Sequence, residues 1–343
     1  MTGTLGGGWA FAAAATVIVA ALVCALLIVA LYPWLKRYAL AKPNARSSHR
    51  TPTPQGGGIA VVTTTLAAAA TAFSYVPLGS SAMPPLAVIG AAAIVMACIG
   101  AIDDVRPLPV GPRLLMQAIV IAGVLYTLPS ELRVAAVLPR WLEFCLLLVG
   151  GLWFVNLVNF MDGIDWMTVA EVIPLTAALS IVGFAGALPA YGVVLALALG
   201  GAMLGFAYFN RPVARIFLGD VGSLPIGLII GALLLLVAGS GNLTAAVIMP
   251  LYYLADATIT LLRRLMRGEP IAQAHRTHFY QRATDNGFTV LGVVTRVFAV
   301  NIGLGALAVA TVMEPGRVSD VTALIGAVIL VTWLLIVLGR GRA

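Results

Sequence analysis

Long apolar stretches fill most of the chain, beginning near the N-terminus with WAFAAAATVIVAALVCALLIVALYPW. A helix that crosses a bilayer needs about 20 predominantly apolar residues, and several stretches reach that length. Of the 343 residues, 61% are hydrophobic and only 10% are charged, which excludes an ordinary soluble domain. The strands of a membrane barrel would instead alternate in polarity over roughly ten residues. The sequence therefore predicts an all-α polytopic membrane protein, with the whole chain, 1–343, in one transmembrane domain.

About eleven stretches are long and apolar enough to be membrane-spanning helices. The connections near residues 187 and 240 are very short, so ten spans would remain if one of these hairpins were not formed. The expected spans are 9–32, 57–77, 85–102, 114–130, 141–158, 168–186, 189–209, 222–239, 242–262, 290–313 and 320–339.

The basic residues indicate the orientation of these helices. If the loop after the first helix is cytoplasmic, alternation leaves only Arg133, Arg140 and Arg317 outside, so that 17 of the 20 Lys and Arg residues share the cytoplasmic side. Cytoplasmic loops of membrane proteins carry an excess of Lys and Arg. The pattern predicts an N-terminus outside and a C-terminus in the cytoplasm. A net charge of +7 then suits anionic lipid headgroups and anionic substrates, and no nucleic acid is expected as a partner.

The Asp, Asn and His residues of the motifs fall on the same predicted side, and the outside loops hold only Glu131, Glu314 and Asp320 as acids. Five cytoplasmic motif loops are expected, at about 33–56, 103–113, 159–167, 210–221 and 263–289. The motifs are KPNARSSHRTPTPQGGG from residue 42, AIDDVRPLP from 101, NLVNFMDGID from 156, FNRPVARIFLGDVGS from 209 and HRTHFYQR from 275.

Three carboxylates are candidates for a metal site. Asp103 and Asp104 are adjacent at a helix end, where they repel each other unless a cation or a proton intervenes. Mg²⁺ binds through one or two carboxylates together with substrate phosphates. Asp220 opens a helix after a Gly-bounded turn, where backbone N–H groups favour anions and Ser223 adds a hydroxyl. The alternatives are two solvated Asp at a membrane boundary and simple N-capping by Asp220.

In NLVNFMDGID a polar side chain recurs at every third position. Near a helix end this spacing puts the four side chains on one stripe, where a single ligand could meet two amides and two carboxylates. Four polar side chains in a row have no role in packing against lipid. The residues of this predicted substrate-binding stripe are Asn156, Asn159, Asp162 and Asp165.

The first and the last motif are rich in donors for phosphate. Two His three residues apart in HRTHFYQR could bind a transition metal, but no third ligand is adjacent, and phosphate binding by His and Arg is the better interpretation. The three consecutive Gly of the first motif let the chain turn closely into the next helix. The donors expected to meet phosphate are Lys42, Arg46, His49, His275, Arg276 and His278.

Asp256 differs from these residues because it lies within the expected span 242–262. A carboxylate inside a span is costly and normally faces the interior of the bundle. Asp256 is therefore predicted to be structural or to line a substrate groove. Arg263, two turns further along, could share its polar track.

Together the five motifs resemble the polyprenyl-phosphate N-acetylhexosamine-1-phosphate transferase family, of the glycosyltransferase 4 type. The resemblance covers residues 42 to 282, with the motifs in the family's order. The histidine loop has fewer histidines than in the peptidoglycan branch, and the pattern looks closer to the enzymes that initiate O-antigen synthesis. Trp166 stands where a small residue is expected after the second Asp, so the local contacts to the substrate are expected to differ.

The resemblance implies an enzyme of the bacterial inner membrane with its active site on the cytoplasmic face. It would transfer N-acetylhexosamine-1-phosphate from a UDP-sugar to undecaprenyl phosphate, releasing UMP and starting an O-antigen or cell-wall glycan. The sugar would be GlcNAc or a 6-deoxy HexNAc such as FucNAc or QuiNAc. The family depends on Mg²⁺, with Mn²⁺ as a substitute, and a homodimer is conceivable.

The resemblance also assigns roles to individual residues. Asp103, Asp104 and Asp220 look like the catalytic carboxylates, and Asp220, with Asp103, would hold the metal. Asn210 looks like the asparagine ten residues before the metal ligand. Either Asp of the 103/104 pair could deprotonate the lipid phosphate, and a covalent aspartyl-phosphate route stays open beside direct attack.

Two other functions compete with this one. A transporter or flippase of lipid-linked sugars would place ionisable residues at mid-bilayer between broken helices, whereas here only Asp256 is drawn deep. A phosphotransferase acting on CDP-alcohols would crowd its carboxylates and Gly into one short helical motif, and the sequence has no such motif.

Overall fold

The computed structural model describes residues 7–41, 52–72, 83–129, 131–270 and 276–340. Within these residues, nine helices are long and apolar enough to cross a membrane, and the only strands are two of two residues each. The prediction of an all-α polytopic membrane protein is confirmed. The helices are α1 Gly7–Tyr38, α2 Gly57–Ala72, α3 Met83–Val105, α4 Val110–Thr127, α5 Arg140–Met161, α6 Met167–Phe184, α7 Ala190–Asn210, α8 Asp220–Gly239, α9 Leu243–Ile248, α10 Leu251–Met266, α11 Phe279–Asp285, α12 Val290–Met313 and α13 Arg317–Arg340.

Nine of the eleven expected spans contain a helix long enough to cross a membrane, and the structure differs from the prediction in four respects. In the expected span 57–77, α2 has 16 residues and ends at Ala72, the last residue described there. The span 242–262 is two helices, α9 and α10, because Pro250 has no N–H to continue the first one. Helix α3 runs on to Val105, so the acidic pair lies in its last turn and not in a loop. The expected loop 263–289 holds the end of α10 and the whole of α11.

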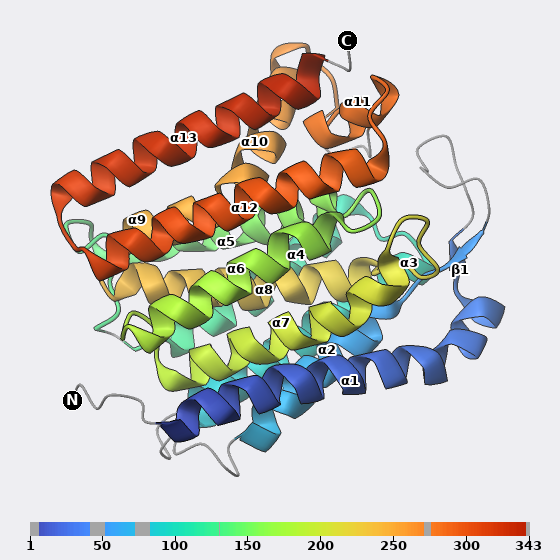
Figure 1. Cartoon of the computed structure of the whole chain (residues 1–343), viewed down its shortest axis with the longest axis horizontal. Helices are drawn as coiled ribbons and strands as arrows, with labels where there is room; N and C mark the ends of the chain where they lie inside the picture. Colours follow the sequence, from blue (N-terminus) through green and yellow to red (C-terminus); the bar gives the residue numbers. More distant parts are fainter. Residues whose placement is uncertain (1–6, 42–51, 73–82, 130, 271–275, 341–343) are drawn as a thin grey trace.

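The helices form a bundle around α8. In Figure 1, α1, α7, α6, α12 and α13 lie side by side from bottom to top, and neighbours in this row pack against each other. Helix α8 packs against α2, α3 and α5, and nearly all of its side chains are buried. A helix that is apolar all round belongs in such an interior. Asp220 therefore stands at the start of the central helix of the bundle.

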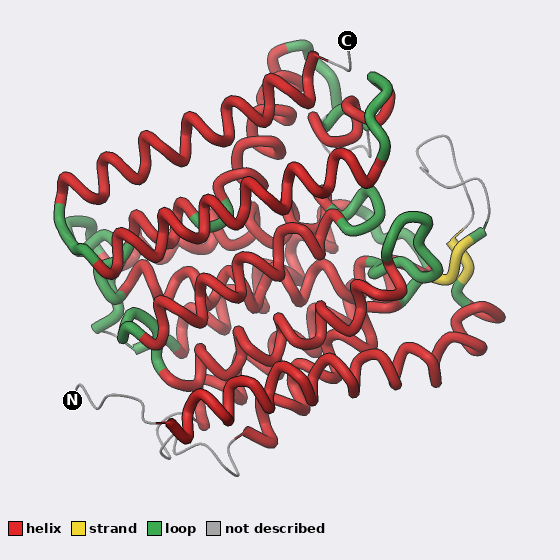
Figure 2. Tube along the Cα trace, viewed as in Figure 1, coloured by secondary structure: helices red, strands yellow, loops and turns green. Residues whose placement is uncertain are grey.

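One end of the bundle carries the only strands of the described chain. Strand β1, Leu40–Ala41, pairs antiparallel with β2, Thr53–Pro54, and both lie at the right of Figures 1 and 2. Gln55 continues from β2 and forms a bridge with Phe217, just before α8. The start of α2 is thereby held against the start of α8.

The three consecutive glycines, 56 to 58, serve this contact. Gly56 has φ +109°, a backbone conformation that favours glycine. A Cβ on Gly58 would lie 2.2 Å from the Cα of Gly222 in α8. The two helix starts can touch only because both positions lack a side chain.

At the opposite end of the bundle, Glu143, at the start of α5, accepts several hydrogen bonds. Its Oε1 accepts the N–H groups of Val134 and Ala135 at 2.7 and 2.8 Å, and Arg133 pairs with its Oε2. The Glu143 side chain is 7% exposed and that of Arg133 is 22% exposed. This carboxylate holds residues 133 to 135 of the α4–α5 connection against the start of α5.

Glu143→Ala is expected to lower the free energy of unfolding by about 3 kcal/mol, because it leaves a partly buried guanidinium and two N–H groups unpaired. Thermal unfolding in detergent measures the effect. Glu314→Ala, an exposed carboxylate at the end of α12, is the control and should leave the melting temperature unchanged. Equal melting temperatures of the two variants would show that the contacts of Glu143 contribute nothing to stability.

Candidate active site

A cavity of about 740 Å³ opens at the end of the bundle that carries the strands. Its walls come from the end of α1, the β1–β2 region, the last turn of α3, the α5–α6 connection, the segment before α8 and α11. Its polar lining includes Gln55, Asp104, Asn159, Asp162, Asp165, Asn210, Asp220 and Gln281. All five motifs thus contribute at least one residue to one cavity.

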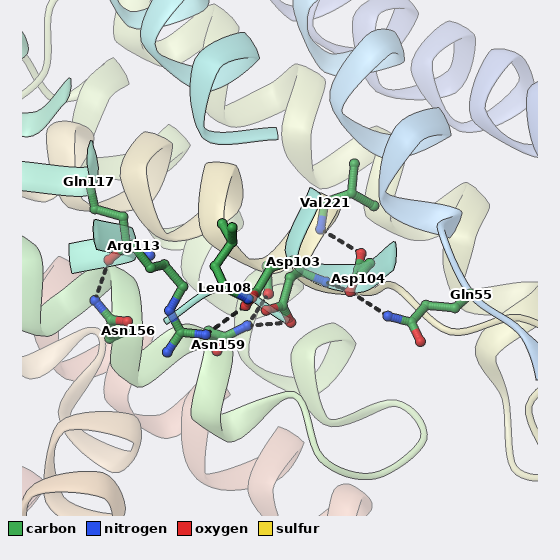
Figure 3. A network of polar contacts seen from close by, with 11 residues as sticks. Gln55, Asp103, Asp104, Leu108, Arg113, Gln117, Asn156, Asn159 and Val221 are labelled. Atoms are coloured by element: carbon green, nitrogen blue, oxygen red, sulfur yellow. Dashed lines mark hydrogen bonds and ion pairs between the residues drawn. The ribbon is translucent and has the colours of Figure 1, made fainter. Parts of the chain in front are cut away.

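Asp104 fixes the start of α8. Its Oδ1 accepts the backbone N–H of Asp220 at 2.9 Å and its Oδ2 that of Val221 at 3.0 Å, while the Gln55 amide also donates to Oδ1 (Figure 3). The first N–H groups of a helix have no partner within the helix. Asp104 supplies that partner from α3, and the N-cap position is Gly219, so the alternative that Asp220 is the N-cap is wrong.

Asp220 itself points its carboxylate at groups from other elements. Asn159, in the last turn of α5, donates its amide to Asp220 Oδ1 at 2.7 Å and to Ser223 Oγ at 2.9 Å. Asp103, in the last turn of α3, lies close enough to interact electrostatically with Asp220. Three helices thus bring their polar ends to this one carboxylate.

Asp103 lies beside the cavity and not on its wall. Its Oδ1 accepts the Leu108 N–H at 2.6 Å, and its Oδ2 accepts Arg113 Nη1 at 2.6 Å (Figure 3). The guanidinium offsets one charge of the acidic pair. Each carboxylate oxygen of Asp103 and of Asp104 therefore accepts at least one hydrogen bond.

The donor set fits Mg²⁺. Two neighbouring carboxyl groups, such as Asp103 and Asp220, favour a proton or a cation beside them. No three His, Cys, Asp or Glu of the described residues are arranged to hold a metal on their own. Mg²⁺ needs only one or two carboxylates, since water and substrate phosphates complete its octahedron.

The segment from Asn156 to Asp165 does not form one stripe. Helix α5 ends at Met161, so the later residues leave the helical repeat. Asn156 is buried and donates to Gln117 Oε1 at 2.7 Å, outside the cavity lining, while Asp165 accepts the Ala214 N–H at 3.0 Å. The prediction that one ligand meets all four residues is wrong, because only Asn159, Asp162 and Asp165 line the cavity.

Asp162 stands in the connection after α5 and accepts a hydrogen bond from Thr168. Burial, together with the charges of Asp104 and Asp165, raises the pKa of the Asp162 carboxyl to about 7, although the Thr168 bond opposes this shift. Near neutral pH this group therefore exchanges a proton readily. The clustered carboxyl groups at the cavity therefore favour the binding of a cation or of a proton.

Trp166 explains how the third and fourth motifs are joined. Its φ of 63° is the left-handed conformation, and it is the N-cap of α6. Its backbone N–H donates to Asn210 Oδ1 at 2.8 Å and its indole N–H to the Ala207 carbonyl at 2.6 Å. Asn210 in turn donates to the Ile216 carbonyl at 2.9 Å, so that it shapes the segment before α8.

Several predicted substrate-binding residues lie elsewhere. Ser223 is fully buried behind Asn159. Arg276 pairs with Asp285 at 3.2 Å, and His278, 2% exposed, lies against Asp256; neither lines the cavity. Four predicted residues fall outside the described part of the chain: Lys42, Arg46, His49 and His275.

Some residues at the site were not predicted from the sequence. Gln55, Arg113 and Gln281 each belong to or follow a quoted motif, but nothing in their type or spacing set them apart. An apolar wall was missed as well, since its residues look like ordinary span residues. It is formed by Trp34, Leu35, Tyr38, Ile59, Ala101 and Val105.

Comparison with known proteins identifies the family. Residues 86–238 match the family model of glycosyl transferase family 4. A Streptomyces coelicolor protein assigned as a glycosyltransferase is 31% identical, over 87% of this chain and 70% of its own length. The chain belongs to glycosyl transferase family 4.

Two other relatives of this family 4 glycosyl transferase have more specific names. A Bacillus subtilis protein assigned as an undecaprenyl-phosphate N-acetylglucosaminyl 1-phosphate transferase is 25% identical, over 80% of this chain and 78% of its own. The decaprenyl-phosphate N-acetylglucosaminephosphotransferase of Mycolicibacterium smegmatis is 29% identical, over 88% and 83%. The resemblance to polyprenyl-phosphate N-acetylhexosamine-1-phosphate transferases is confirmed, and the glycosyl transferase is a multi-pass membrane protein.

Proposed function

We propose that this glycosyl transferase moves N-acetylhexosamine-1-phosphate from a UDP-sugar to undecaprenyl phosphate, on the cytoplasmic face of the bacterial inner membrane. An oxygen of the lipid phosphate attacks the β-phosphorus of the donor. The bond between that phosphorus and the oxygen bridging to the α-phosphate breaks, so that UMP leaves and a lipid-linked sugar pyrophosphate forms. The product would start an O-antigen or a cell-wall glycan.

The observation that carries the proposal is the composition of the cavity wall. Acids and amides from α3, α5 and α8 face the cavity, and an apolar wall rises from α1 and α3. A reaction between a lipid phosphate and a sugar nucleotide needs both surfaces at one place. The named activities of the two prenyl-phosphate relatives support the same reaction.

Asp220 and Asp103 are the residues that would hold Mg²⁺, or Mn²⁺ in its place. When bound, the ion would offset negative charge on the pyrophosphate. Asn159 orients the Asp220 carboxylate through its amide. Asp104 holds the start of α8, because its two carboxylate oxygens accept the first N–H groups of that helix.

The same hydrogen bonds bear on the choice between the two chemical routes. A nucleophilic carboxylate needs a free lone pair aimed at phosphorus. Both oxygens of Asp103 and of Asp104 accept hydrogen bonds from fixed donors. An ionised carboxylate has about four lone-pair sites, so these bonds leave direct attack and an aspartyl-phosphate route both open.

Release of UMP from purified protein, undecaprenyl phosphate and Mg²⁺ tests the proposal with a panel of donors. UDP-GlcNAc and the 6-deoxy sugars UDP-FucNAc and UDP-QuiNAc should be compared, with UDP-glucose as the sugar that lacks the N-acetyl group. We expect UMP from at least one UDP-HexNAc and no release after chelation by EDTA. UMP from none of them would contradict the proposed reaction.

A further inference from the structure

Asp256 is a buried carboxylate outside the cavity whose oxygens have five hydrogen-bonding partners among the described residues. It stands in α10 with no solvent exposure, where an ionisable side chain is costly. Its two oxygens are within hydrogen-bonding distance of five groups, at 3.0 to 3.3 Å. These are the Phe279 N–H, the Tyr280 N–H, His278 Nδ1, the Tyr252 hydroxyl and the Thr260 hydroxyl.

Two of the five groups are the backbone N–H groups that open α11. Phe279 N lies 3.0 Å from Asp256 Oδ1, and Tyr280 N lies 3.2 Å from Oδ2. First-turn N–H groups need an acceptor, and a carboxylate also suits the positive end of the helix. Asp256 therefore docks a helix of only seven residues onto α10.

Helix α11 connects Asp256 to the cavity. The Tyr280 hydroxyl donates to the Phe160 carbonyl at 3.0 Å, two residues before Asp162. A Cβ on Gly163 would lie 2.1 Å from the Tyr280 hydroxyl and 2.9 Å from the Gln281 amide nitrogen. Gln281 itself lines the cavity. The connection that carries Asp162 thus rests directly on the first turn of α11.

The ionic states are consistent with these bonds. Burial and the charge of Asp256 raise the pKa of the Tyr280 hydroxyl well above its ordinary range, so this group remains a donor. The Tyr280 ring also stacks on His278, with centroids 5.7 Å apart. His278 is thereby part of the same packed unit.

We propose that Asp256 is a positioning residue for the transferase reaction. It acts through α11 and Tyr280 on residues 159–166, which are the end of α5 and the α5–α6 connection. This inference rests on the proposed function for its kinetic effect, but its structural part does not. Misplacing reacting groups by about 1 Å can cost roughly 100-fold in rate, while binding by the remaining contacts persists. The expected signature is a lower kcat with a little-changed KM.

Amide hydrogen exchange and steady-state kinetics on the full-length protein test this chain of contacts. Asp256→Asn should speed exchange at least tenfold in both 279–285 and 159–166. Tyr280→Phe, which leaves Asp256 and its backbone partners intact, should speed exchange in 159–166 alone. Glu143→Gln, the same change at a buried carboxylate of the opposite end, should alter neither segment even where it lowers stability.

In the kinetic part, Asp256→Asn should reduce kcat for UMP release at least tenfold and Tyr280→Phe at least threefold. The KM for the UDP-sugar should change by less than about threefold in both. Unchanged exchange in 159–166 in both variants, or unchanged kcat in both, would overturn the proposal. If Asp256→Asn does not fold, the exchange in 159–166 and the kcat of Tyr280→Phe alone decide the outcome. If the wild type releases no UMP but the exchange results hold, the proposed function fails and the docking of α11 stands.

Discussion

Asp220→Asn is expected to reduce kcat for UMP release by at least about 10³-fold, the loss typical of removing a major source of charge stabilisation at a transferring phosphoryl group. The substitution is isosteric, and the Asn oxygen can still accept the bond from Asn159 that Asp220 Oδ1 accepts at 2.7 Å. Only the negative charge is lost. The change should therefore remove metal binding and leave the bundle folded.

Two measurements separate this effect from misfolding. The melting temperature of Asp220→Asn should stay within a few degrees of the wild type. Asp320→Asn, at the start of α13 and at the far end of the bundle, should retain full activity. Activity of Asp220→Asn within tenfold of the wild type would remove Asp220 from the metal site.

Gly58→Ala is expected to have the second largest effect, on both activity and stability. The added Cβ would stand 2.2 Å from Gly222 Cα and 2.4 Å from Gly222 N, which are backbone atoms of α8 and cannot rotate away. Relief requires α2 and the start of α8 to separate, and such overpacking costs typically 1–3 kcal/mol. Because Asp220 lies two residues before Gly222, we expect kcat to fall at least about 100-fold.

Gly123→Ala is the matched control, since Gly123 is also a helical glycine but has open space around its Cβ position. There alanine should be neutral or slightly stabilising, because it has the higher helix propensity. UMP release and thermal unfolding of both variants give the comparison. Equal behaviour of the two variants would show that the α2–α8 contact is not needed at this distance.

Composition and motif order were enough to predict the membrane-spanning helices and the family. Apolar length specifies a span almost alone, because lipid leaves the backbone no other way to satisfy its hydrogen bonds. The break between α9 and α10 depends on Pro250, which the hydropathy pattern conceals. The extension of α3 through Asp103 and Asp104 was missed because hydropathy falls before the helix ends.

The site was predictable by residue type but not by role. Asp103 and Asp104 are equivalent in sequence, yet one pairs with Arg113 and the other holds the start of α8. That division depends on contacts with elements that are distant in the sequence. His278 was expected at phosphate, but its placement against Asp256 could not be read from the spacing in HRTHFYQR. The need for glycine at position 58 depends on Gly222, which lies opposite it in α8 and is distant in the sequence.

The position of a phosphorus label tests the proposed reaction most directly. Purified protein, undecaprenyl phosphate and Mg²⁺ would be incubated with an accepted UDP-HexNAc labelled with ³²P in either the α- or the β-phosphate. The proposed reaction predicts that β-label enters the organic-phase lipid while α-label stays in water as UMP. Transfer of the sugar with both labels left in water as UDP would contradict it, since the sugar alone would then have moved.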